Sequence, residues 1–362
     1  MTNKTTRGIV LKDYGQTPTL EEIEILDPGM DEVRVQIAAS GICHTDLGYM
    51  RDARSVPVLL GHEGAGIIAE VGANVTHTKP GDHVVINWQA KCQRCRHCLS
   101  GRQDLCEDIQ STAAPRVFWQ KEPISVMLNA GTFSPWVVVP ASGAIPIPEE
   151  MPLDKAALIG CGVATGVGAA LFTAAVQPGE SVAVFGVGGV GLNTVQGARL
   201  ANAGKIIALD LDDTRLAQAQ HFGATHTINN QSEAAVEAVR DLTKGRGVDH
   251  VFEVTGLSDL MLAGIDMLAR GGTLTLIGAA DRDAVLPLLP RRFMSQQQRL
   301  LGCIYGNIRP EIHLPLFAEW YLDGRLLLDA LHTHSLSLDD VPAYFEAGNH
   351  EGIRSVVQFE DT

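Results

Sequence analysis

The sequence predicts an α/β protein with two domains, one rich in β-strands and one built on a doubly wound parallel sheet. The chain has 362 residues, more than a single hydrophobic core usually supports. Its first part alternates short β-rich runs with Gly and Pro turns, whereas strands and helices alternate from Ser181 onward. We therefore expect a β-rich domain of residues 1–162 and 305–362 and an α/β domain of residues 163–304.

The composition is that of an ordinary globular protein and argues against several classes of partner. Hydrophobic residues make up 45% of the chain and charged residues 19%. The formal charge of −14 argues against nucleic acid and anionic membranes, because both attract clustered Lys and Arg. Residues 1–10 lack the apolar segment of a secretory signal, so we expect a cytoplasmic protein. In that compartment the seven cysteines favour metal ligation over disulfides.

Four runs typical of strands mark the β-rich domain: Glu32–Ala38, Gly66–Val71, His83–Asn87 and Trp136–Val139. The later segment Ala156–Gly179 has no charged residue and is long enough to span a bilayer. Its glycines, and the strand that follows it directly, favour a buried helix over Lys155–Ala175 instead.

Strands and helices then alternate through the second domain. The predicted strands are Ser181–Phe185, Lys205–Leu209, His226–Ile228, Asp249–Val254, Thr273–Ile277 and Arg299–Ile304. The predicted helices are Val190–Ala203, Thr214–Phe222, Ala234–Leu242 and Asp259–Leu268. Such alternation implies right-handed crossovers and a parallel sheet covered on both faces. Six strands are what a doubly wound dinucleotide-binding sheet needs.

A glycine-rich motif joins the first of these strands to its helix. It reads Gly186-Val187-Gly188-Gly189-Val190-Gly191. Gly186 permits a tight turn, Gly188 lets the backbone approach a pyrophosphate, and Gly191 lets the helix pack on the strand. The helix N-terminus adds unpaired N–H groups and a positive dipole end. We therefore predict a dinucleotide site, with Gly189 and Val190 among its contacts.

An acidic residue ends the next strand, as such a site requires. Asp210 lies nineteen positions after Gly191, where a carboxylate accepts both ribose hydroxyls and repels a 2′-phosphate. NAD is therefore favoured over NADP. Arg215, on the following helix, is a candidate neighbour of the adenosine ribose, and an exposed helical arginine with no cofactor role is the alternative.

Four cysteines are closely spaced within one loop. Cys92, Cys95, Cys98 and Cys106 follow a CxxCxxCx7C pattern. Four thiolates complete a tetrahedral zinc shell and leave no position for substrate, so we expect a structural zinc. An iron–sulfur cluster is the alternative, since it also takes four cysteines. Nearby cations would help to offset the thiolate charge: Lys91, Arg94, Arg96, His97 and Arg102.

A second group of potential metal ligands is dispersed along the chain. Cys43 lies in GICHTD, His62 and Glu63 lie in GHEG, and Cys161 lies in GCG. Three mixed nitrogen and sulfur ligands leave a fourth position open, as in a catalytic zinc site. Taken singly, Cys43 and Cys161 would more often be core residues, but every cysteine except Cys303 now has a partner set. We interpret Cys303 as a core residue.

These motifs resemble the zinc-containing medium-chain alcohol dehydrogenases over nearly the whole chain. The resemblance runs from GICHTD and GHEGAG through the four-cysteine loop, GTFSPWVVV, GCGVATG and FGVGGVG to the C-terminal Gly352-Ile353-Arg354. The segment between Cys106 and Thr132 is most similar to the long-loop dimeric branch, which includes liver-type and thiol-adduct formaldehyde dehydrogenases. The resemblance implies a GroES-like catalytic domain, a Rossmann NAD-binding domain and two zinc ions per chain.

The resemblance also implies roles for individual residues. Cys43, His62 and Cys161 would hold the catalytic zinc, with Glu63 as a neighbouring or alternate ligand. Asp46 would orient His62, and Thr45 would hold the alcohol hydroxyl and pass its proton toward the cofactor ribose. The other implied cofactor contacts are His44 and Arg354 at the pyrophosphate, Thr165 and Val190 behind the nicotinamide, and Ile277. The implied substrate pocket, with core packing as the alternative, is Trp88, Met127, Leu128 and Ala279.

Three positions depart from the family pattern. Gly48 stands where many relatives have a histidine that ends a proton relay. Gln110 stands where glutathione-dependent relatives have an arginine, and Arg54 stands where they have an acid. The last two changes count against a glutathione adduct as substrate.

We therefore expect a zinc-dependent, NAD-linked alcohol dehydrogenase that reversibly oxidises a primary or secondary alcohol with an apolar or aromatic body. Oxidation of a thiol–formaldehyde adduct is one alternative. A non-catalytic NAD(H)-binding protein is another, although Cys43, Thr45, His62 and Cys161 are all present. The expected partners are a small alcohol or aldehyde and further copies of the chain, as a homodimer or homotetramer, with neither nucleic acid nor membrane.

Overall fold

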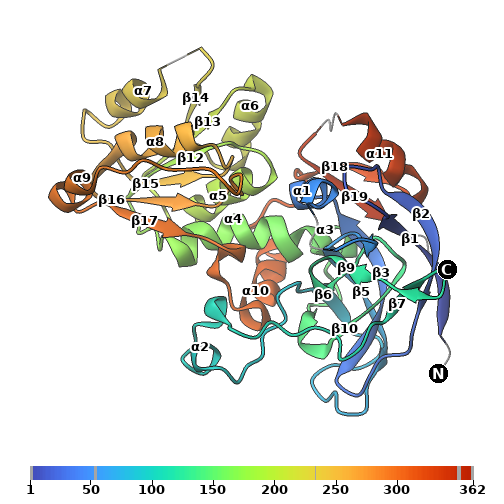
Figure 1. Ribbon diagram of the computed structural model, residues 1–362. Coiled ribbons are helices and arrows are strands. Elements are labelled where there is room, and N and C mark those ends of the chain that lie inside the picture. Colours follow the sequence, from blue (N-terminus) through green and yellow to red (C-terminus); the bar gives the residue numbers. More distant parts are fainter. Residues whose placement is uncertain (1–2, 53–54, 233, 349–351, 360–362) are drawn as a thin grey trace. The chain divides into compact units, whose positions relative to one another are not determined.

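The protein is known from a computed structural model that describes residues 3–52, 55–232, 234–348 and 352–359 (Figure 1). The chain divides into two compact units. Unit 1 comprises Met1–Cys161 and Arg309–Thr362, and unit 2 comprises Gly162–Ile308. The C-terminal segment therefore belongs to the same unit as the N-terminal segment.

Two β-sheets form unit 1 within the described ranges. The first contains β1 (Lys4–Leu11), β2 (Thr19–Ile25), β4 (Val58–Leu59), β7 (Val117–Trp119), β8 (Glu122–Pro123) and β9 (Ser125–Val126). The second contains β3 (Glu32–Gly41), β5 (Glu63–Val71), β6 (His83–Ile86), β10 (Trp136–Pro140), β11 (Ala144–Pro146), β18 (His332–Leu336) and β19 (Arg354–Gln358). Their orders are β8-β7-β2-β1-β4-β9 and β11-β6-β5-β3-β19-β18, with β10 also paired to β3.

Strand β3 brings together the segments that carry the candidate site. Its apolar residues Val33, Val35 and Ile37 alternate along the strand and are buried in one core cluster. At its end, Gly41 is the register partner of both Glu63 on β5 and Val356 on β19. The loop after β3 therefore starts beside β5 and the C-terminal strand.

Unit 1 also contains helices within the described ranges. They are α1 (His44–Asp52), α2 (Arg96–Leu99), α3 (Leu153–Leu158), α10 (Pro310–Leu322) and α11 (Val341–Ala347). Single 3₁₀ turns lie at Gln103–Leu105, Met127–Asn129, Ala141–Gly143 and Leu338–Asp340.

Helix α3 opens a longer helical segment, Leu153–Thr173, which contains α4 (Ala164–Gly168) and two π-helical turns, Ile159–Val163 and Ala169–Thr173. In the described part of the chain this is the one helix long and apolar enough to cross a membrane. However, 72% of its apolar window is buried inside the protein, as in a core helix. This agrees with the buried helix predicted over Lys155–Ala175.

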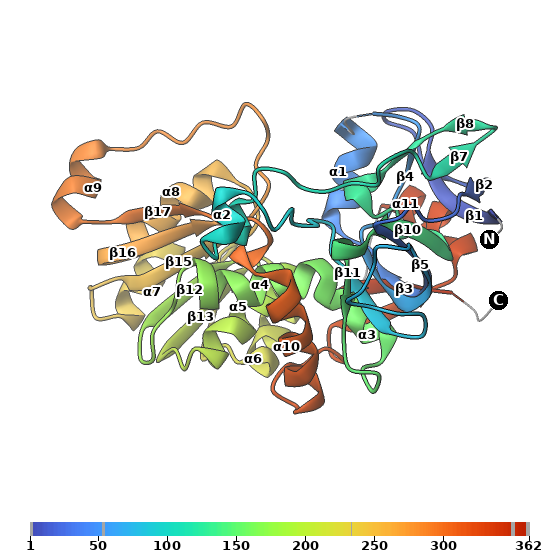
Figure 2. The ribbon, with the colours of Figure 1, turned by 90° about the horizontal axis from the view of Figure 1, so that it is seen from below.

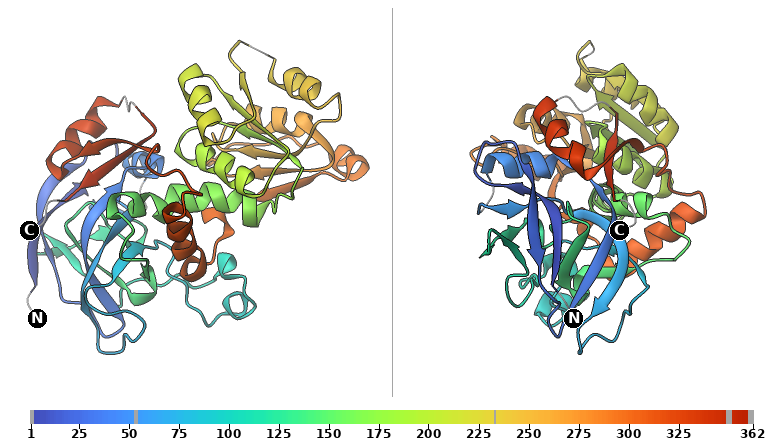
Figure 3. Two further views of the ribbon diagram at one scale, coloured as in Figure 1. Left: turned by 180° about the vertical axis from the view of Figure 1, so that it is seen from behind. Right: turned by 90° about the vertical axis from the view of Figure 1, so that its right-hand side faces the viewer.

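Unit 2 is built on a parallel sheet. Its strands are β12 (Ser181–Phe185), β13 (Lys205–Asp210), β14 (His226–Asn229), β15 (Val248–Glu253), β16 (Leu268–Leu276) and β17 (Arg299–Gly302), in the order β14-β13-β12-β15-β16-β17. The helices are α5 (Gly189–Leu200), α6 (Asp213–Phe222), α7 (Ala235–Leu242), α8 (Ser258–Met267) and α9 (Pro290–Gln296), and a 3₁₀ turn lies at Tyr305–Asn307. Figures 2 and 3 show this sheet and its helices from further directions.

The strand order confirms the predicted doubly wound sheet. All five neighbouring pairs are parallel. Helices α5 and α6 pack on each other, as do α7 and α8, in keeping with crossovers on two faces. The strand order reverses between β12 and β15, and their carboxyl ends are where such sheets bind dinucleotides.

Candidate active site

Three separate elements of unit 1 carry the dispersed ligand set. Cys43 lies in the loop between β3 and α1, His62 and Glu63 lie at the start of β5, and Cys161 lies in the first π-helical turn after α3. One ligand atom from each of these four residues lies within 4.8 Å of the others. Irregular π-helical turns of this kind occur often at functional sites, because they re-aim one side chain.

Asp46 connects two members of this set. Its Oδ2 accepts a hydrogen bond of 2.8 Å from the backbone N–H of Cys43, and its Oδ1 lies 3.4 Å from His62 Nδ1. Both Asp46 and His62 are fully buried. The carboxylate therefore lies beside Nδ1, where it can orient the ring, while Nε2 lies 4.0 Å from Glu63 Oε1.

The buried polar atoms of the set fit a bound metal ion. His62 Nε2 has no hydrogen-bond partner among the described residues, and neither has Oε1 of Glu63, 4.0 Å away. Such an orphaned ring nitrogen next to two thiols is costly unless a ligand occupies the space. One histidine and two cysteines are the donor set of a catalytic zinc, with a fourth position left for substrate.

The thiols themselves are arranged to release protons to a metal. The hydrogen bond to Cys161, with His62 and Arg354 nearby, holds the pKa of Cys43 well below its ordinary value. The same hydrogen bond, together with burial, raises the pKa of Cys161. Burial alone would lower the pKa of His62, but Asp46 and Cys43 raise it well above the ordinary value. A bound dication would displace the protons that remain on these groups, because metal ligands must be deprotonated.

Arg354 on β19 forms a buried ion pair with Glu63. Its guanidinium also donates a 3.0 Å hydrogen bond to the carbonyl oxygen of Ile42, the residue before the first ligand cysteine. Burial raises the pKa of Glu63 to about 7, against the opposing charge of Arg354. Arg354 therefore ties β19 to both the ligand loop and Glu63, and its contact with a pyrophosphate stays a prediction.

The first turn of helix α1 contains both exposed and buried residues. His44 and Thr45 are exposed while Asp46 is buried. The Thr45 Oγ1 lies 3.6 Å from the Sγ of Cys43, so a hydroxyl group sits beside the ligand sulfur. Gly48, one turn further, has no described atom within 4 Å of the position that a Cβ would take.

The four clustered cysteines also converge. Their sulfur atoms lie within 4.8 Å of one another, with 3.5 Å between Cys92 and Cys106 and 4.0 Å between Cys92 and Cys98. Backbone N–H groups in the loop donate to the sulfurs, and that of Cys98 is the main cause that lowers the pKa of Cys95 to about 6. Burial raises the pKa of Cys98 to about 12. Donated N–H bonds stabilise thiolates, which suits a four-thiolate metal shell.

Charged residues around this loop pair mostly with one another. Ion pairs link Arg94 to Asp108 at 2.8 Å, Arg96 to Glu107 at 2.8 Å and Arg102 to Asp104 at 2.7 Å. The arginines predicted to offset the thiolate charge are thus largely neutralised by carboxylates. Lys91 is the buried cation here; burial lowers its pKa while the Cys106 and Cys98 sulfurs raise it.

Steric contacts explain the glycine motif of unit 2. Gly186 has φ +82°, a conformation that favours glycine. A Cβ on Gly191 would overlap the carbonyl oxygen of Gly186, so only glycine lets α5 start this close to β12. Gly188, the residue before α5, would direct a Cβ into open space among the described atoms. The third glycine therefore serves packing, and the second leaves room for a ligand.

Asp210 ends β13 and organises the loops around it. Its Oδ2 accepts from the backbone N–H of Val187 at 2.9 Å, and its Oδ1 accepts from those of Leu211 and Asp212 at 2.8 and 3.2 Å. Arg215 is exposed, with a guanidinium nitrogen 3.9 Å from Oδ1. The carboxylate is therefore fixed in one orientation at the carboxyl end of the sheet.

Two family models match the chain. The alcohol dehydrogenase GroES-like domain matches residues 29–149, and the zinc-binding dehydrogenase domain matches residues 189–319. S-(hydroxymethyl)glutathione dehydrogenase of Paracoccus denitrificans is 38% identical over 376 residues, covering 98% of this chain and 100% of the relative. The chain belongs to the zinc-binding medium-chain alcohol dehydrogenase family.

Solved structures of this family show the same fold. An alcohol dehydrogenase zinc-binding domain protein from Burkholderia ambifaria has a TM-score of 0.93 at 31% identity, covering 99% of this chain and all of the other. Benzyl alcohol dehydrogenase from Acinetobacter calcoaceticus has a TM-score of 0.90 at 26% identity, with the same coverage. The predicted family, fold class and enzyme class are confirmed: this alcohol dehydrogenase family member is a zinc-binding NAD(P)-linked oxidoreductase. Zinc is accordingly favoured over an iron–sulfur cluster in the four-cysteine loop.

The other residues implied by the resemblance lie in both units of this dehydrogenase. In unit 1, Met127 is fully buried in a core cluster, against which Leu128 packs, and Trp88 packs against another cluster. In unit 2 lie Thr165 on α4, Val190 on α5, Ile277 directly after β16 and the exposed Ala279. Their roles stay predictions.

Besides Gly48, the positions that depart from the family pattern are Gln110 and Arg54. Gln110 is half-buried, and its side chain donates a 2.9 Å hydrogen bond to the carbonyl of Asp108. Arg54 lies outside the described residues.

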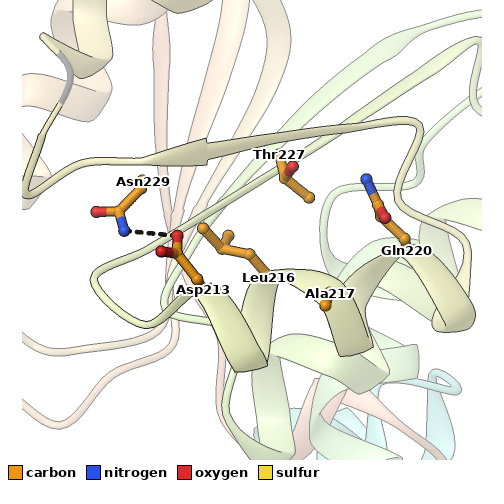
Figure 4. A pocket seen from close by; sticks show the side chains of 6 residues that line it. All are labelled: Asp213, Leu216, Ala217, Gln220, Thr227 and Asn229. Carbon is orange, nitrogen blue, oxygen red and sulfur yellow. Dashed lines mark hydrogen bonds between the residues drawn. The ribbon is translucent and has the colours of Figure 1, made fainter.

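A small surface pocket lies between α6 and β14 (Figure 4). Its volume is 240 Å³, and its lining is Asp213, Leu216, Ala217, Gln220, Thr227 and Asn229. Asn229 donates a 2.7 Å hydrogen bond to Asp213 across it. None of the predicted metal or cofactor residues lines this pocket.

Sequence reasoning missed the pairing of Glu63 with Arg354. The residues after Arg354 read Ser-Val-Val, a buried strand pattern. An arginine at the start of a buried strand needs a carboxylate partner, and that signal was available. Which carboxylate it meets depends on the pairing of β19 with β3, which the sequence does not reveal.

Proposed function

We propose that this zinc-binding dehydrogenase uses NAD to oxidise the hydroxymethyl group of a thiol–formaldehyde adduct. The observation that carries the substrate class is the 38% identity, over 98% of the chain, to a relative named S-(hydroxymethyl)glutathione dehydrogenase. The grouping of Cys43, His62 and Cys161 supports the zinc chemistry. We further propose that the enzyme is a cytoplasmic homo-oligomer, in line with the sequence.

The residues of unit 1 account for the proton that leaves the substrate. Zinc held by Cys43, His62 and Cys161 would lower the pKa of a hydroxyl group that contacts it. Asp46 fixes the two ligands Cys43 and His62. Thr45, whose hydroxyl lies beside Cys43, receives the hydroxyl proton and passes it on. The balanced reaction is R–S–CH₂OH + NAD⁺ → R–S–CHO + NADH + H⁺, with the hydride moving from carbon to nicotinamide.

We expect Gly48→His to change the pH dependence of turnover. A side chain fits at this position because no described atom lies within 4 Å of the added Cβ. An imidazole near Thr45 can accept the proton that Thr45 receives from the substrate. If proton transfer limits turnover, kcat at about pH 7 should rise several-fold. The plot of kcat against pH should also gain an inflection at about pH 6.5, the ordinary pKa of histidine. The measurement is kcat against pH, with Gly48→Ala as the non-titrating control. The same profile in both variants would contradict this relay.

NAD preference should depend on the charge of Asp210. Asp210→Asn keeps one acceptor oxygen for the N–H groups of Leu211 and Asp212, loses the acceptor for that of Val187, and removes the charge that repels a 2′-phosphate. We expect the ratio of kcat/KM for NAD over NADP to fall by about tenfold, equivalent to about 1.4 kcal/mol. Steady-state kinetics with both cofactors tests this, with thermal unfolding as the control for the loop. An unchanged ratio would place the ribose contact elsewhere.

Oxidation of a simple apolar or aromatic alcohol is the second candidate function. Gln110 occupies the position of an arginine in glutathione-dependent relatives, and its side chain is bound to the Asp108 carbonyl. The solved structure of benzyl alcohol dehydrogenase also matches 99% of the chain. If the first proposal holds, these observations favour a thiol other than glutathione.

NADH formation from a matched substrate panel separates the candidates. One arm contains formaldehyde alone and formaldehyde with glutathione, cysteine, cysteamine or coenzyme A; the other contains aliphatic, allylic and benzylic alcohols. Thiol-dependent oxidation of formaldehyde supports the first proposal, and oxidation of benzylic alcohols alone supports the second. A protein that binds NAD and two zinc ions but oxidises neither arm would favour the non-catalytic alternative.

A further inference from the structure

A cluster of charged and polar side chains lies at the start of α3, outside the metal site. The Lys155 Nζ lies 2.8 Å from His332 Nδ1, 3.0 Å from Asp154 Oδ2 and 3.8 Å from Asp329 Oδ1. His332 Nε2 lies 3.0 Å from the hydroxyl oxygen of Ser335. The side chains of Lys155 and His332 are only 15% and 6% exposed. Two segments far apart in the sequence, α3 and β18, are thus joined by a nearly buried cation.

The donors in this cluster fix the state of His332. An ammonium group has no lone pair, so His332 Nδ1 must accept the hydrogen bond from Lys155. The ring proton is then on Nε2 and is donated to Ser335, which makes the imidazole neutral. Nδ1 and Asp154 Oδ2, 3.1 Å apart, are both acceptors, and Lys155 bridges them. Burial and the charge of Lys155 lower the pKa of His332 despite the opposing effect of Asp154, consistent with the neutral ring.

Both segments lead directly to the candidate metal site. Lys155 and Cys161 lie on the same continuous helical segment, less than two turns apart. On the other side, His332 is the register partner of Arg354, which binds Glu63 and the Ile42 carbonyl. Helix α3 also packs against β3, β5 and β19, the strands that flank this site. The cluster therefore fixes where the helix that bears Cys161 meets the strand that bears Arg354.

We propose, on the basis of the zinc assignment above, that Lys155 is a positioning residue for the catalytic metal, acting through His332 and Asp154 to hold Cys161 in place. Without the ammonium group, the contacts of Lys155 Nζ with His332 and Asp329 would be lost, and the His332 ring would have to move its proton from Nε2 to Nδ1 to bond Asp154 Oδ2, 3.1 Å away. The start of α3 would then be held to β18 by this one contact and would be positioned less accurately. Cys161 would then be presented to the metal less accurately, and the metal would leave faster.

The two cysteine sites allow a test with an internal control. The zinc-loaded enzyme is mixed with a chromogenic chelator, and the release of each zinc ion is followed separately. Lys155→Met should release catalytic zinc about tenfold faster than wild type. Substitution of residues that orient metal ligands typically lowers metal affinity or activity roughly 10–100-fold, and we expect an effect at the lower end of this range. Release from the four-cysteine loop should not change. Lys155→Arg, which keeps a cation and donors, should restore most of the retention.

Two further measurements separate positioning from general loss of stability. Lys12→Met is the matched control, since Lys12 also forms an ion pair in unit 1, with Glu21 at 2.5 Å. With cobalt in the catalytic site, the sulfur-to-metal absorption band should shift in Lys155→Met but not in Lys12→Met. Unchanged release and an unchanged band in Lys155→Met would overturn the inference, as would equal acceleration at both metal sites. A wild-type chain that binds one metal ion only would overturn the zinc assignment as well.

Acidity provides an independent readout of the same cluster. The pKa of His332 is lowered in the folded protein. Its contribution to the stability of the fold is therefore present at a pH above the ordinary pKa of histidine, and it is lost as the pH falls through the lowered pKa of the folded protein. The charged groups around the ring are Asp154, Lys155 and Asp329. The other titratable groups nearby are Tyr321, which donates a hydrogen bond to Asp329, His334 on the same strand, and Arg354, the register partner of His332. Between about pH 7 and about pH 5, catalytic zinc release should therefore accelerate more in wild type than in His332→Asn, which keeps an acceptor but does not titrate. Parallel pH curves for the two proteins would overturn this role of His332.

Discussion

Cys161→Ser should lose about 10³-fold in kcat and one of two zinc ions while it still binds NAD. A serine hydroxyl is a poor zinc ligand at neutral pH, so the set falls to Cys43 and His62, with Glu63 beside them. Polarisation by a metal contributes several kcal/mol to such reactions, and about 1.4 kcal/mol corresponds to each factor of ten. Metal content, NAD titration and kcat are measured on the same sample.

Cys303→Ser is the matched control for this substitution. Cys303 is half-buried, accepts a 3.3 Å hydrogen bond from Thr173, and belongs to neither metal group. It should keep two zinc ions and nearly full activity. Preserved activity in Cys161→Ser would remove Cys161 from the ligand set, whereas loss of both zinc ions would mean that the substitution unfolds unit 1.

The doubly wound sheet could be predicted because local sequence and sterics specify it. The run Ser181–Phe185 corresponds residue for residue to β12, since a short apolar run ended by glycines has few other uses in a chain with strand–helix alternation. Only β16 differs much, beginning at Leu268 rather than Thr273 because Leu268 pairs with Val248. Boundaries set by pairing partners cannot be found from local patterns.

The sequence could predict which residues serve as metal ligands in the candidate site, but not the contacts that position them. Spacing suffices for the four clustered cysteines, whose loop closes locally. In the dispersed set, Asp46 holds both a backbone N–H and a histidine ring, and Arg354 reaches Glu63 across the pairing of β19 with β3. These roles depend on contacts between residues up to 291 positions apart, and no local period encodes them.

Gly191→Ala should destabilise unit 2 itself, in contrast to Gly188→Ala, which should weaken NAD binding and leave stability unchanged. The added methyl at Gly191 would overlap the carbonyl oxygen of Gly186, so the start of α5 must move away from β12. Overpacking of this kind costs about 3 kcal/mol, or roughly 6–12 °C in the midpoint of the corresponding unfolding transition. Differential scanning calorimetry without cofactor measures this cost.

The second substitution isolates the ligand from the fold. Gly188 has φ −76° and faces open space among the described atoms, so alanine is accommodated in the cofactor-free protein. The backbone there must approach the pyrophosphate closely, and a methyl group would keep it away. NAD affinity should therefore fall by about tenfold or more, with no change in the unfolding midpoint. Normal NAD binding by Gly188→Ala would mean that the pyrophosphate does not lie over this turn, and equal loss of stability in both variants would mean that the two glycines share one packing role.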